Sequence, residues 1–322
     1  MPTHCALLLA VASMFAVQAT AQEFPTKVVR LIVPYAPGGP IDTAARGFAE
    51  HLSRLWKKSV VIDNRPGANE VIAADFVAKS ETDGHTILFA TDSTFSMNPL
   101  LFKKLPYDHK QDLVPVTRVA FVNMALLVDG SLPVNNMAEF VSLIRANPGK
   151  YNYGSAGGGP AANIHFDAFL RANGLSMTVA SYKGIAPAIQ DLLGGRIHAM
   201  MSGISAVTPY LGTGKVKVLG VNGTKRAKSI PDVPTFTQAG FPKLEAYFYL
   251  GLAVPKGTPP AVIDQISSAA RKVLAEPAFA ERTLDPFAFE PLGETPKQFA
   301  DFLLVDRARA EKKIRDAGIQ PN

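Results

Sequence analysis

Two glycine-rich segments hold the residues whose types and spacing best suit the binding of an anion. Gly38 and Gly39 stand between the apolar run 28–33 and a helical pattern that begins close to Ile41 or Asp42. Three further glycines, 157–159, stand in the same way between a strand-like segment and a second helical pattern. Glycine lets backbone N–H groups approach a ligand, and a helix start adds unpaired donors and about half a positive charge. The repeated module predicts a cleft with a helix N-terminus on each wall, suited to a carboxylate or a phosphate.

The first module taken alone has a plainer interpretation. Gly38 and Gly39 could form only a tight turn, with Asp42 as the helix cap, because both residue types are common in those positions. The second module of the same kind later in the chain is what favours binding over a simple turn.

The N-terminus is predicted to be a targeting segment. Residues 6–17 are nearly all apolar but too few to span a bilayer, and Ala19-Thr20-Ala21 follows as a signal-peptidase site. We therefore expect residues 1–21 to be a signal peptide and Gln22 to begin the exported chain. Cys5, the one cysteine of the sequence, would leave with that peptide. The mature chain would then have no disulfide and no thiol chemistry.

Length and charge limit the architecture and the partners. About 300 residues remain after export, more than one core usually sustains, so two α/β lobes are expected. The formal net charge of +6 would by itself allow nucleic acid as a partner, but export excludes it. Lys312, Lys313 and Arg315 share the last helical pattern with acidic residues, which indicates a solvated face; a docking patch is the alternative.

Strand and helix patterns alternate along the chain. The order 60–62 (strand), 71–79 (helix) and 86–90 (strand) after the first module is typical of a parallel sheet with helices on both faces. Ligands bind such sheets at the C-terminal ends of the strands, where loops 37–39 and 91–94 would meet. Later strands are expected at 121–128, 177–182, 197–201, 216–221 and 248–254, the last as a return crossing, and the chain is mainly helical after 259.

Catalytic and cofactor signatures are mostly absent. Residues 157–162 fit G-x-G-x-x-A, but the later acidic residue is missing and Pro160 sits in the turn, so no dinucleotide is expected. Ser155 is not in a nucleophile elbow, because Tyr153 stands where glycine is needed. The histidines show no metal-ligand spacing: His51, His85, His109, His165 and His198. Neither a cofactor nor a metal is therefore expected.

Eight short motifs, in register from about residue 24 to 318, resemble one known family. They are Pro34-Tyr35-Ala36-Pro37-Gly38-Gly39 with Asp42 and Arg46, Asn64-Arg65-Pro66-Gly67-Ala68, Asp83-Gly84, Asn98-Pro99, Lys104-Leu105-Pro106-Tyr107-Asp108, Tyr182-Lys183-Gly184 with Ala186-Pro187, Asp191-Leu192-Leu193-Gly194-Gly195, and Pro231-Asp232-Val233-Pro234-Thr235. The chain resembles the Bug-type periplasmic solute receptors, the substrate-binding subunits of tripartite tricarboxylate transporters.

The resemblance implies an α/β, type 2 periplasmic-binding-protein fold. Its two α/β lobes are joined by a hinge of two crossing strands and close over a small carboxylate. We expect lobe 1 to comprise residues 22–123 and 248–322, and lobe 2 to comprise residues 124–247. The implied function is to capture a small carboxylate-containing metabolite in the periplasm, as a monomer, and to deliver it to the membrane subunits of such a transporter.

The resemblance also implies which residues bind. Tyr35 would form an apolar wall, Gly38 and Gly39 would donate backbone hydrogen bonds, and Asp42 would accept one from a ligand ammonium, hydroxyl or bridging water. The other expected ligand-binding residues come from the loop after the third strand and from the second lobe: Thr91, Asp92, Ser93, Thr94, Ser155, Gly157, Gly159, Asn163 and Ser202. No covalent step is implied.

Five residues depart from the family's pattern near the expected cleft. Asn69-Glu70 replaces two glycines, Asp92 replaces a small Ser or Ala, Asn163 replaces a His, and Ser202 replaces an Asp. The ligand therefore cannot be copied from the family's usual dicarboxylates, amino acids or aromatic acids. If Asp92 faces the ligand, a carboxylate that also carries an ammonium or hydroxyl is favoured. Alternatively, Asp92 points away and caps a turn.

Two other classes of function stay open at this stage. One is a ligand receptor that signals to a membrane sensor kinase. The other is an exported hydrolase or isomerase with Asp42 or Asp92 as its base, which would need a pKa raised by burial.

Overall fold

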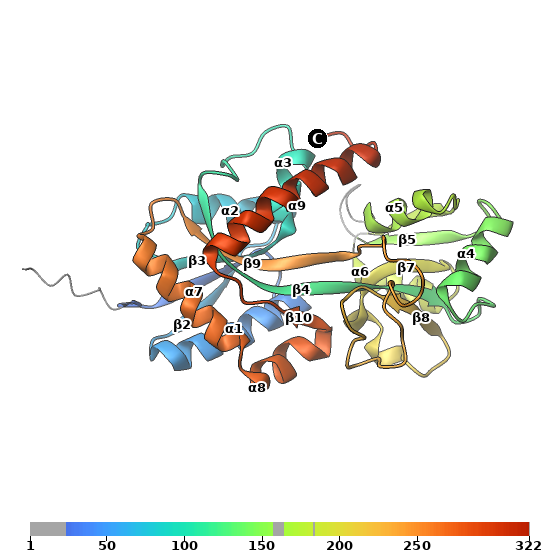
Figure 1. Cartoon of the computed structure of the whole chain (residues 1–322), viewed down its shortest axis with the longest axis horizontal. Coiled ribbons are helices and arrows are strands. Elements are labelled where there is room, and N and C mark those ends of the chain that lie inside the picture. The colour runs from blue at the N-terminus through green and yellow to red at the C-terminus, as the bar shows by residue number, and fades with distance from the viewer. Residues whose placement is uncertain (1–23, 157–163, 183, 322) are drawn as a thin grey trace, which may run out of the picture.

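The computed structural model describes residues 24–156, 164–182 and 184–321. Within these residues ten strands form one sheet along the length of the molecule (Figure 1). The strands are β1 (Val29–Val33), β2 (Val60–Asn64), β3 (Thr86–Thr91), β4 (Leu113–Asp129), β5 (Asn152–Ala156), β6 (Thr178–Tyr182), β7 (Ala199–Gly203), β8 (Val216–Val221), β9 (Tyr247–Pro255) and β10 (Phe289–Pro291). The helices are α1 (Pro40–Trp56), α2 (Val71–Ala78), α3 (Asn98–Leu101), α4 (Met137–Ala146), α5 (Ile164–Ala172), α6 (Ile185–Leu193), α7 (Pro260–Leu274), α8 (Pro277–Phe279) and α9 (Pro296–Asp316).

The parallel sheet predicted for the N-terminal part is confirmed. Strand β1 pairs in parallel with both β2 and β3, so the three strands end at the same edge of the sheet. The side chains of Leu31, Ile32 and Val33 are all buried, as expected for a strand covered on both faces. The C-terminal edge carries the loop before α1 and the loop after β3.

Helix α1 forms where the glycine segment ends. Pro40 occupies the first turn, where its missing N–H costs nothing, and Asp42 follows in the same turn. Buried residues recur at helical spacing, including Ala45, Phe48 and Leu52, and pack the helix on the sheet. The helix begins within one residue of the expected position.

Two long strands connect the halves of the molecule. Strand β4 is antiparallel to β9 from Leu113 opposite Pro255 to Asn123 opposite Tyr247, and its C-terminal part then pairs with β7 and β8. Figure 1 shows β4 and β9 running from one body to the other. The predicted strand 121–128 is therefore only the second half of β4, and β9 is the return crossing.

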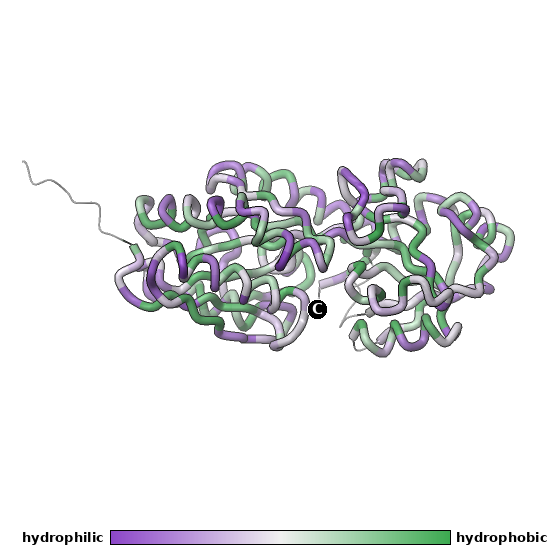
Figure 2. Tube along the Cα trace, turned by 90° about the horizontal axis from the view of Figure 1, so that it is seen from below, coloured by the Kyte–Doolittle hydropathy of each residue, from purple (hydrophilic) through white to green (hydrophobic). Residues whose placement is uncertain are grey.

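The buried apolar side chains form separate cores in the two bodies. Figure 2 shows hydrophobic segments of the chain within both bodies. In the first body, which we call lobe 1, the cores on the two sheet faces include Phe48 and Phe299. In the second body, lobe 2, they include Phe140 and Ile189. Independent cores of this kind let two bodies move relative to each other about the strands that join them.

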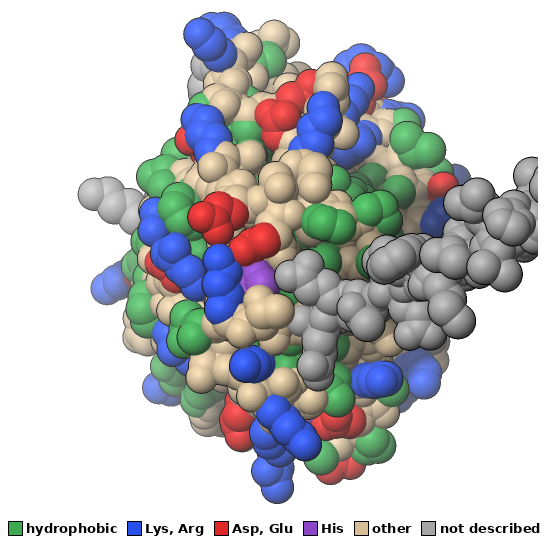
Figure 3. All heavy atoms as spheres, turned by 90° about the vertical axis from the view of Figure 1, so that its left-hand side faces the viewer, with side chains coloured by type: hydrophobic (Ala, Val, Ile, Leu, Met, Phe, Trp, Pro, Cys, Tyr) green, Lys and Arg blue, Asp and Glu red, His purple; other side chains and the backbone are tan. Residues whose placement is uncertain are grey.

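The surface charges are dispersed on the face that Figure 3 shows, where Lys and Arg side chains alternate with Asp and Glu. Several form exposed pairs one helical turn apart, such as Arg54 with Glu50. In the part of the chain that the structure describes, no helix is both long and apolar enough to cross a bilayer. The predicted signal peptide lies outside the described residues.

Candidate functional site

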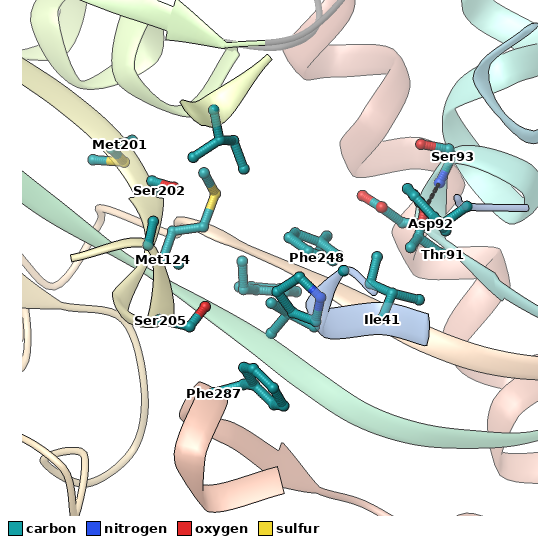
Figure 4. A pocket seen from close by; sticks show the side chains of 18 of the residues that line it. Ile41, Thr91, Asp92, Ser93, Met124, Met201, Ser202, Ser205, Phe248 and Phe287 are labelled. Carbon is teal, nitrogen blue, oxygen red and sulfur yellow. Dashed lines mark hydrogen bonds between the residues drawn. The ribbon is translucent and has the colours of Figure 1, made fainter. Parts of the chain in front are cut away.

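A cavity of about 1040 Å³ lies between the two lobes and is open to solvent. It faces the C-terminal edge of the lobe 1 strands, where ligands of such sheets bind. Figure 4 shows side chains from both lobes and from the connecting strand β9 around it. Its lining includes Tyr35, Gly38, Gly39, Ile41, Thr91, Asp92, Ser93, Met124, Ile164, His165, Ser202, Ser205, Phe248, Asp306, Arg309 and Lys313.

Asp42 is placed differently from the expectation. The residue is 1% exposed and does not line the cavity. The carboxylate accepts hydrogen bonds at 2.8 Å from the Gly38 N–H, from Asn64 Nδ2 and from Arg46 Nε. Burial acts to raise the pKa of Asp42, but the bonds from Arg46, Gly38 and Asn64 outweigh it and lower that pKa. Asp42 therefore holds the glycine loop, and it lacks the raised pKa that a catalytic base would need.

The two glycines of the loop have different tasks. Gly38 has φ = +90°, a conformation that suits glycine, and its N–H is taken by Asp42. Gly39 is extended, and a Cβ atom built on it would meet nothing within 4 Å. No acceptor for the Gly39 N–H is found within residues 24–156, 164–182 and 184–321. Gly39 therefore leaves open space and a backbone donor at the N-terminus of α1, facing the cavity.

Glu70 is the centre of a hydrogen-bond network that the sequence did not reveal. Its side chain is 3% exposed, and its carboxylate accepts bonds from Tyr35 OH (2.5 Å), Thr91 Oγ1 (2.5 Å), the Thr91 N–H (3.1 Å) and Thr94 Oγ1 (2.7 Å). Burial raises the pKa of Glu70 against the opposing effect of these bonds. Tyr35 and Thr91 line the cavity, whereas Thr94 lies outside its lining.

Asp92 lines the cavity at the end of β3 (Figure 4). Burial and the neighbouring carboxylates of Asp306 and Glu70 raise its pKa well above the usual range. Asp92 makes no side-chain cap hydrogen bond to the turn that follows it, although the adjacent Ser93 N–H acts to lower its pKa, and no ion pair of Asp92 is found in the described part of the chain. Its neighbour Ser93 also lines the cavity and donates its N–H to Thr91 Oγ1 at 3.2 Å.

Helix α9 brings both signs of charge to the cavity. Asp306 accepts hydrogen bonds from Ser96 Oγ (2.6 Å) and Tyr249 OH (3.1 Å). Arg309 and Lys313 follow on the same helix. Lys313 lies 4.0 Å from Glu245, and its side chain is 29% exposed. Lys312 and Arg315 are exposed, as the expected solvated face requires, whereas Lys313 departs from it because the cleft lies beside this turn of the helix.

His165 of α5 also lines the cavity but carries no charge there at neutral pH. Burial and the nearby Lys313 lower its pKa to about 3, although Nδ1 is bonded to the Glu245 carbonyl at 2.8 Å. Among the described residues, no group of three or more His, Cys, Asp and Glu side chains is arranged to hold a metal ion.

Lobe 2 contributes a buried hydroxyl group to the cavity lining. Ser202 at the end of β7 is 3% exposed, and its Oγ has no hydrogen-bond partner among the described residues. It lines the cavity together with Ser205 (Figure 4). Ser155 is buried on β5 and does not line the cavity. The other lobe 2 residues expected at the site, Gly157, Gly159 and Asn163, lie outside the described residues.

Two α/β lobes that are joined by long crossing strands and enclose a ligand-sized cleft define a periplasmic binding protein. Residues 44–319 match the family model for the tripartite tricarboxylate transporter family receptor, TctC. The chain belongs to this family of periplasmic solute receptors, which confirms the resemblance and the fold class predicted from the sequence.

Three similar proteins illustrate the relationship. Protein BugT of Bordetella pertussis is 30% identical over 97% of this chain and 97% of its own length. The structure of R. palustris Rpa4515 with adipate is 33% identical, covers 93% of this chain and 100% of that chain, and gives a TM-score of 0.80. MatC from Rhodopseudomonas palustris with bound malate is 28% identical over 90% of this chain and 100% of that chain, with a TM-score of 0.73.

Proposed function

We propose that this protein captures a small carboxylate-containing metabolite in the cleft between its lobes and delivers it to the membrane subunits of a tripartite tricarboxylate transporter. The observation that carries the proposal is the set of unused hydrogen-bond donors on the two walls of one cavity. The Gly39 N–H lies at the N-terminus of α1 on the lobe 1 wall, and the buried Ser202 hydroxyl lies on the lobe 2 wall. The adipate and malate of the two similar structures give the chemical class.

The charges of the lining narrow this class. Asp92 and Asp306 place two carboxylates at the cavity, and Arg309 and Lys313 place two cations there. A ligand that joins a carboxylate to an ammonium or hydroxyl group can bond to the cations with one end and donate to a carboxyl group with the other. A second ligand carboxylate at Asp92 is repelled unless Asp92 is protonated, which its raised pKa favours only at the cost of a proton uptake. We therefore propose hydroxy acids and amino acids ahead of simple dicarboxylates.

The direct experiment is a thermal-shift screen of carboxylic acids on the mature chain, followed by calorimetry. A ligand that binds only the folded state stabilises it, by about 2.7 kcal/mol at a ligand concentration of one hundred times Kd, and therefore raises the melting temperature. The expected hits are hydroxy or amino acids. If no carboxylic acid stabilises the protein while uncharged solutes do, the proposed ligand class is wrong.

The proposed partner requires its own test. Reconstituted vesicles that contain the transporter membrane subunits should take up the radiolabelled acid only when this receptor is also present. Uptake that is unchanged without the receptor would instead favour a role in signalling to a membrane sensor kinase. We also propose lobe boundaries at residues 123/124 and 247/248, where the two connecting strands pass between the separate cores.

A further inference from the structure

Glu70 is a buried carboxylate that pairs with no cation among the residues the structure describes. Four donors converge on its two oxygens: Tyr35 OH, the Thr91 N–H, Thr91 Oγ1 and Thr94 Oγ1. No Lys, Arg or His in the described residues forms an ion pair with it. Buried carboxylates are normally paired with a cation because burial disfavours the charged form. Here three hydroxyl groups and one backbone N–H take that place.

The backbone that carries Glu70 is held in an unfavourable conformation. Ala68, Asn69 and Glu70 have φ values of +45°, +49° and +75°, three successive non-glycine residues in a region that favours glycine. Tertiary bonds hold the segment, since Asn69 Nδ2 donates to Asn98 Oδ1 and Asn98 Nδ2 donates to the Asn69 carbonyl, both at 2.7 Å. Strain of this kind persists only where the surroundings impose it, and it is concentrated at functional sites.

The network lies directly behind the cavity wall. Tyr35, Asn69 and Thr91 each line the cavity, whereas Glu70 does not. Convergent hydroxyl and backbone N–H donors are the groups that bind a carboxylate from outside through charge-assisted hydrogen bonds. In this chain, a side chain of the protein already occupies those donors.

We infer that Glu70 is a built-in carboxylate that fills an anion-binding subsite of lobe 1 and thereby sets ligand specificity. A ligand that brings a second carboxylate to this wall finds the donors taken and two carboxylates, Glu70 and Asp92, close by. Ligands with one carboxylate and a neutral or cationic far end are accepted instead. This specificity role rests on the proposed function, but the occupied subsite itself does not.

The test is to remove the Glu70 side chain from the subsite. In Glu70→Gly the new residue adopts φ = +75° without strain, so the variant is expected to fold, and circular dichroism checks this. Glu70→Ala is the second vacating variant, and Glu70→Gln is the matched control that keeps the side chain in place. The probe is acetate, titrated against chloride at constant ionic strength and followed by thermal shift and calorimetry.

Glu70→Gly should bind acetate at millimolar concentrations, at least tenfold more tightly than wild type or Glu70→Gln. The double variant Glu70→Gly with Thr94→Val should lose most of that gain, because it lacks one of the freed donors. A folded Glu70→Gly or Glu70→Ala protein that binds acetate no better than wild type would show that no anion subsite exists behind Tyr35 and Thr91.

The specificity role is tested by comparing the affinities for a matched ligand pair, succinate and its monoamide succinamate. Wild type should prefer succinamate, and Glu70→Gly should shift the ratio of the two affinities by at least tenfold towards succinate. An unchanged ratio would overturn the specificity role. Failure of the proposed function would look different: no carboxylic acid would bind wild type, although acetate would still bind Glu70→Gly.

Discussion

Replacing Asp42 by alanine tests whether this carboxylate holds the glycine loop or contacts the ligand. The change removes the acceptor of three hydrogen bonds of 2.8 Å, from Gly38, Asn64 and Arg46. Bonds to a charged acceptor contribute roughly 1.5–3 kcal/mol each when fully buried, and less for the bonds from Gly38 and Asn64, which are only partly buried. The Arg46 side chain is 51% exposed, so its contribution is about 0–1 kcal/mol. Because Asn64 is only partly buried, we expect a total loss of about 2–4 kcal/mol.

Urea denaturation and thermal melting measure this loss. At about 2–3 °C per kcal/mol for a chain of this size, the melting temperature should fall by roughly 4–12 °C. The matched control Arg46→Gln removes only the exposed arm and should cost no more than about 1 kcal/mol. Because the pKa of Asp42 is lowered in the folded state, its contribution is present above the unfolded-state pKa of about 3.9 and disappears as the pH falls through the folded-state pKa.

This reasoning would be refuted if Asp42→Ala lowered ligand affinity without lowering the stability of the fold. If Asp42→Ala loses less than about 0.5 kcal/mol of stability while ligand affinity falls a hundredfold or more, Asp42 contacts the ligand and the loop does not depend on it.

Two further substitutions and one sequencing experiment have defined outcomes. Burial and Asp306 raise the pKa of Asp92, so the folded state loses stability as the pH rises from about 4 through that raised pKa. Asp92→Asn should therefore have a higher melting temperature than wild type at pH 7 and the same melting temperature at pH 4. Equal melting temperatures at pH 7 would contradict an unfavourable charge at Asp92. Gly39→Val should leave the melting temperature nearly unchanged, since its Cβ meets no atom within 4 Å, yet weaken calorimetric binding by about tenfold or more; undiminished affinity would place the ligand elsewhere. N-terminal sequencing of exported protein should start at Gln22, and cytoplasmic recovery of a chain that begins with Met1 would disprove the signal peptide.

The sequence predicted the N-terminal part of the fold well because its signals are local. The helix expected at 71–79 is Val71–Ala78, and the strand expected at 86–90 is Thr86–Thr91. Strand β4 was only half predicted, because Pro115, Thr117 and Arg118 interrupt its apolar pattern. Arg118 is nevertheless buried there, with its Nε donating to Glu294 Oε2 at 2.7 Å. A partner 176 residues away leaves no trace in a local pattern.

The candidate site was predicted in part for the same reason. Tyr35, Gly39, Asp92 and Ser93 follow the strands whose C-terminal ends form the cleft, and the order of strands and helices reveals that edge. Asp306, Arg309 and Lys313 were missed because helical spacing separates polar from apolar faces but cannot distinguish a polar face in solvent from one in a cleft. Glu70 was recognised as a departure from the family, but its hydrogen bonds to Tyr35, Thr91 and Thr94 depend on tertiary placement.

The central claim is that the ligand is held by both lobes at once, and Ser202→Ala tests it most directly. The Ser202 hydroxyl has no protein partner among the described residues, so its removal should not destabilise the free protein. A hydrogen bond from the same hydroxyl to a charged ligand contributes roughly 1.5–3 kcal/mol to the free energy of binding. Isothermal titration of the acid that best stabilises wild type should therefore show at least about tenfold weaker binding by Ser202→Ala, with an unchanged melting temperature of the free protein. Equal affinity of wild type and Ser202→Ala would mean that this wall of lobe 2 does not hold the ligand, and the two-lobe account would be contradicted.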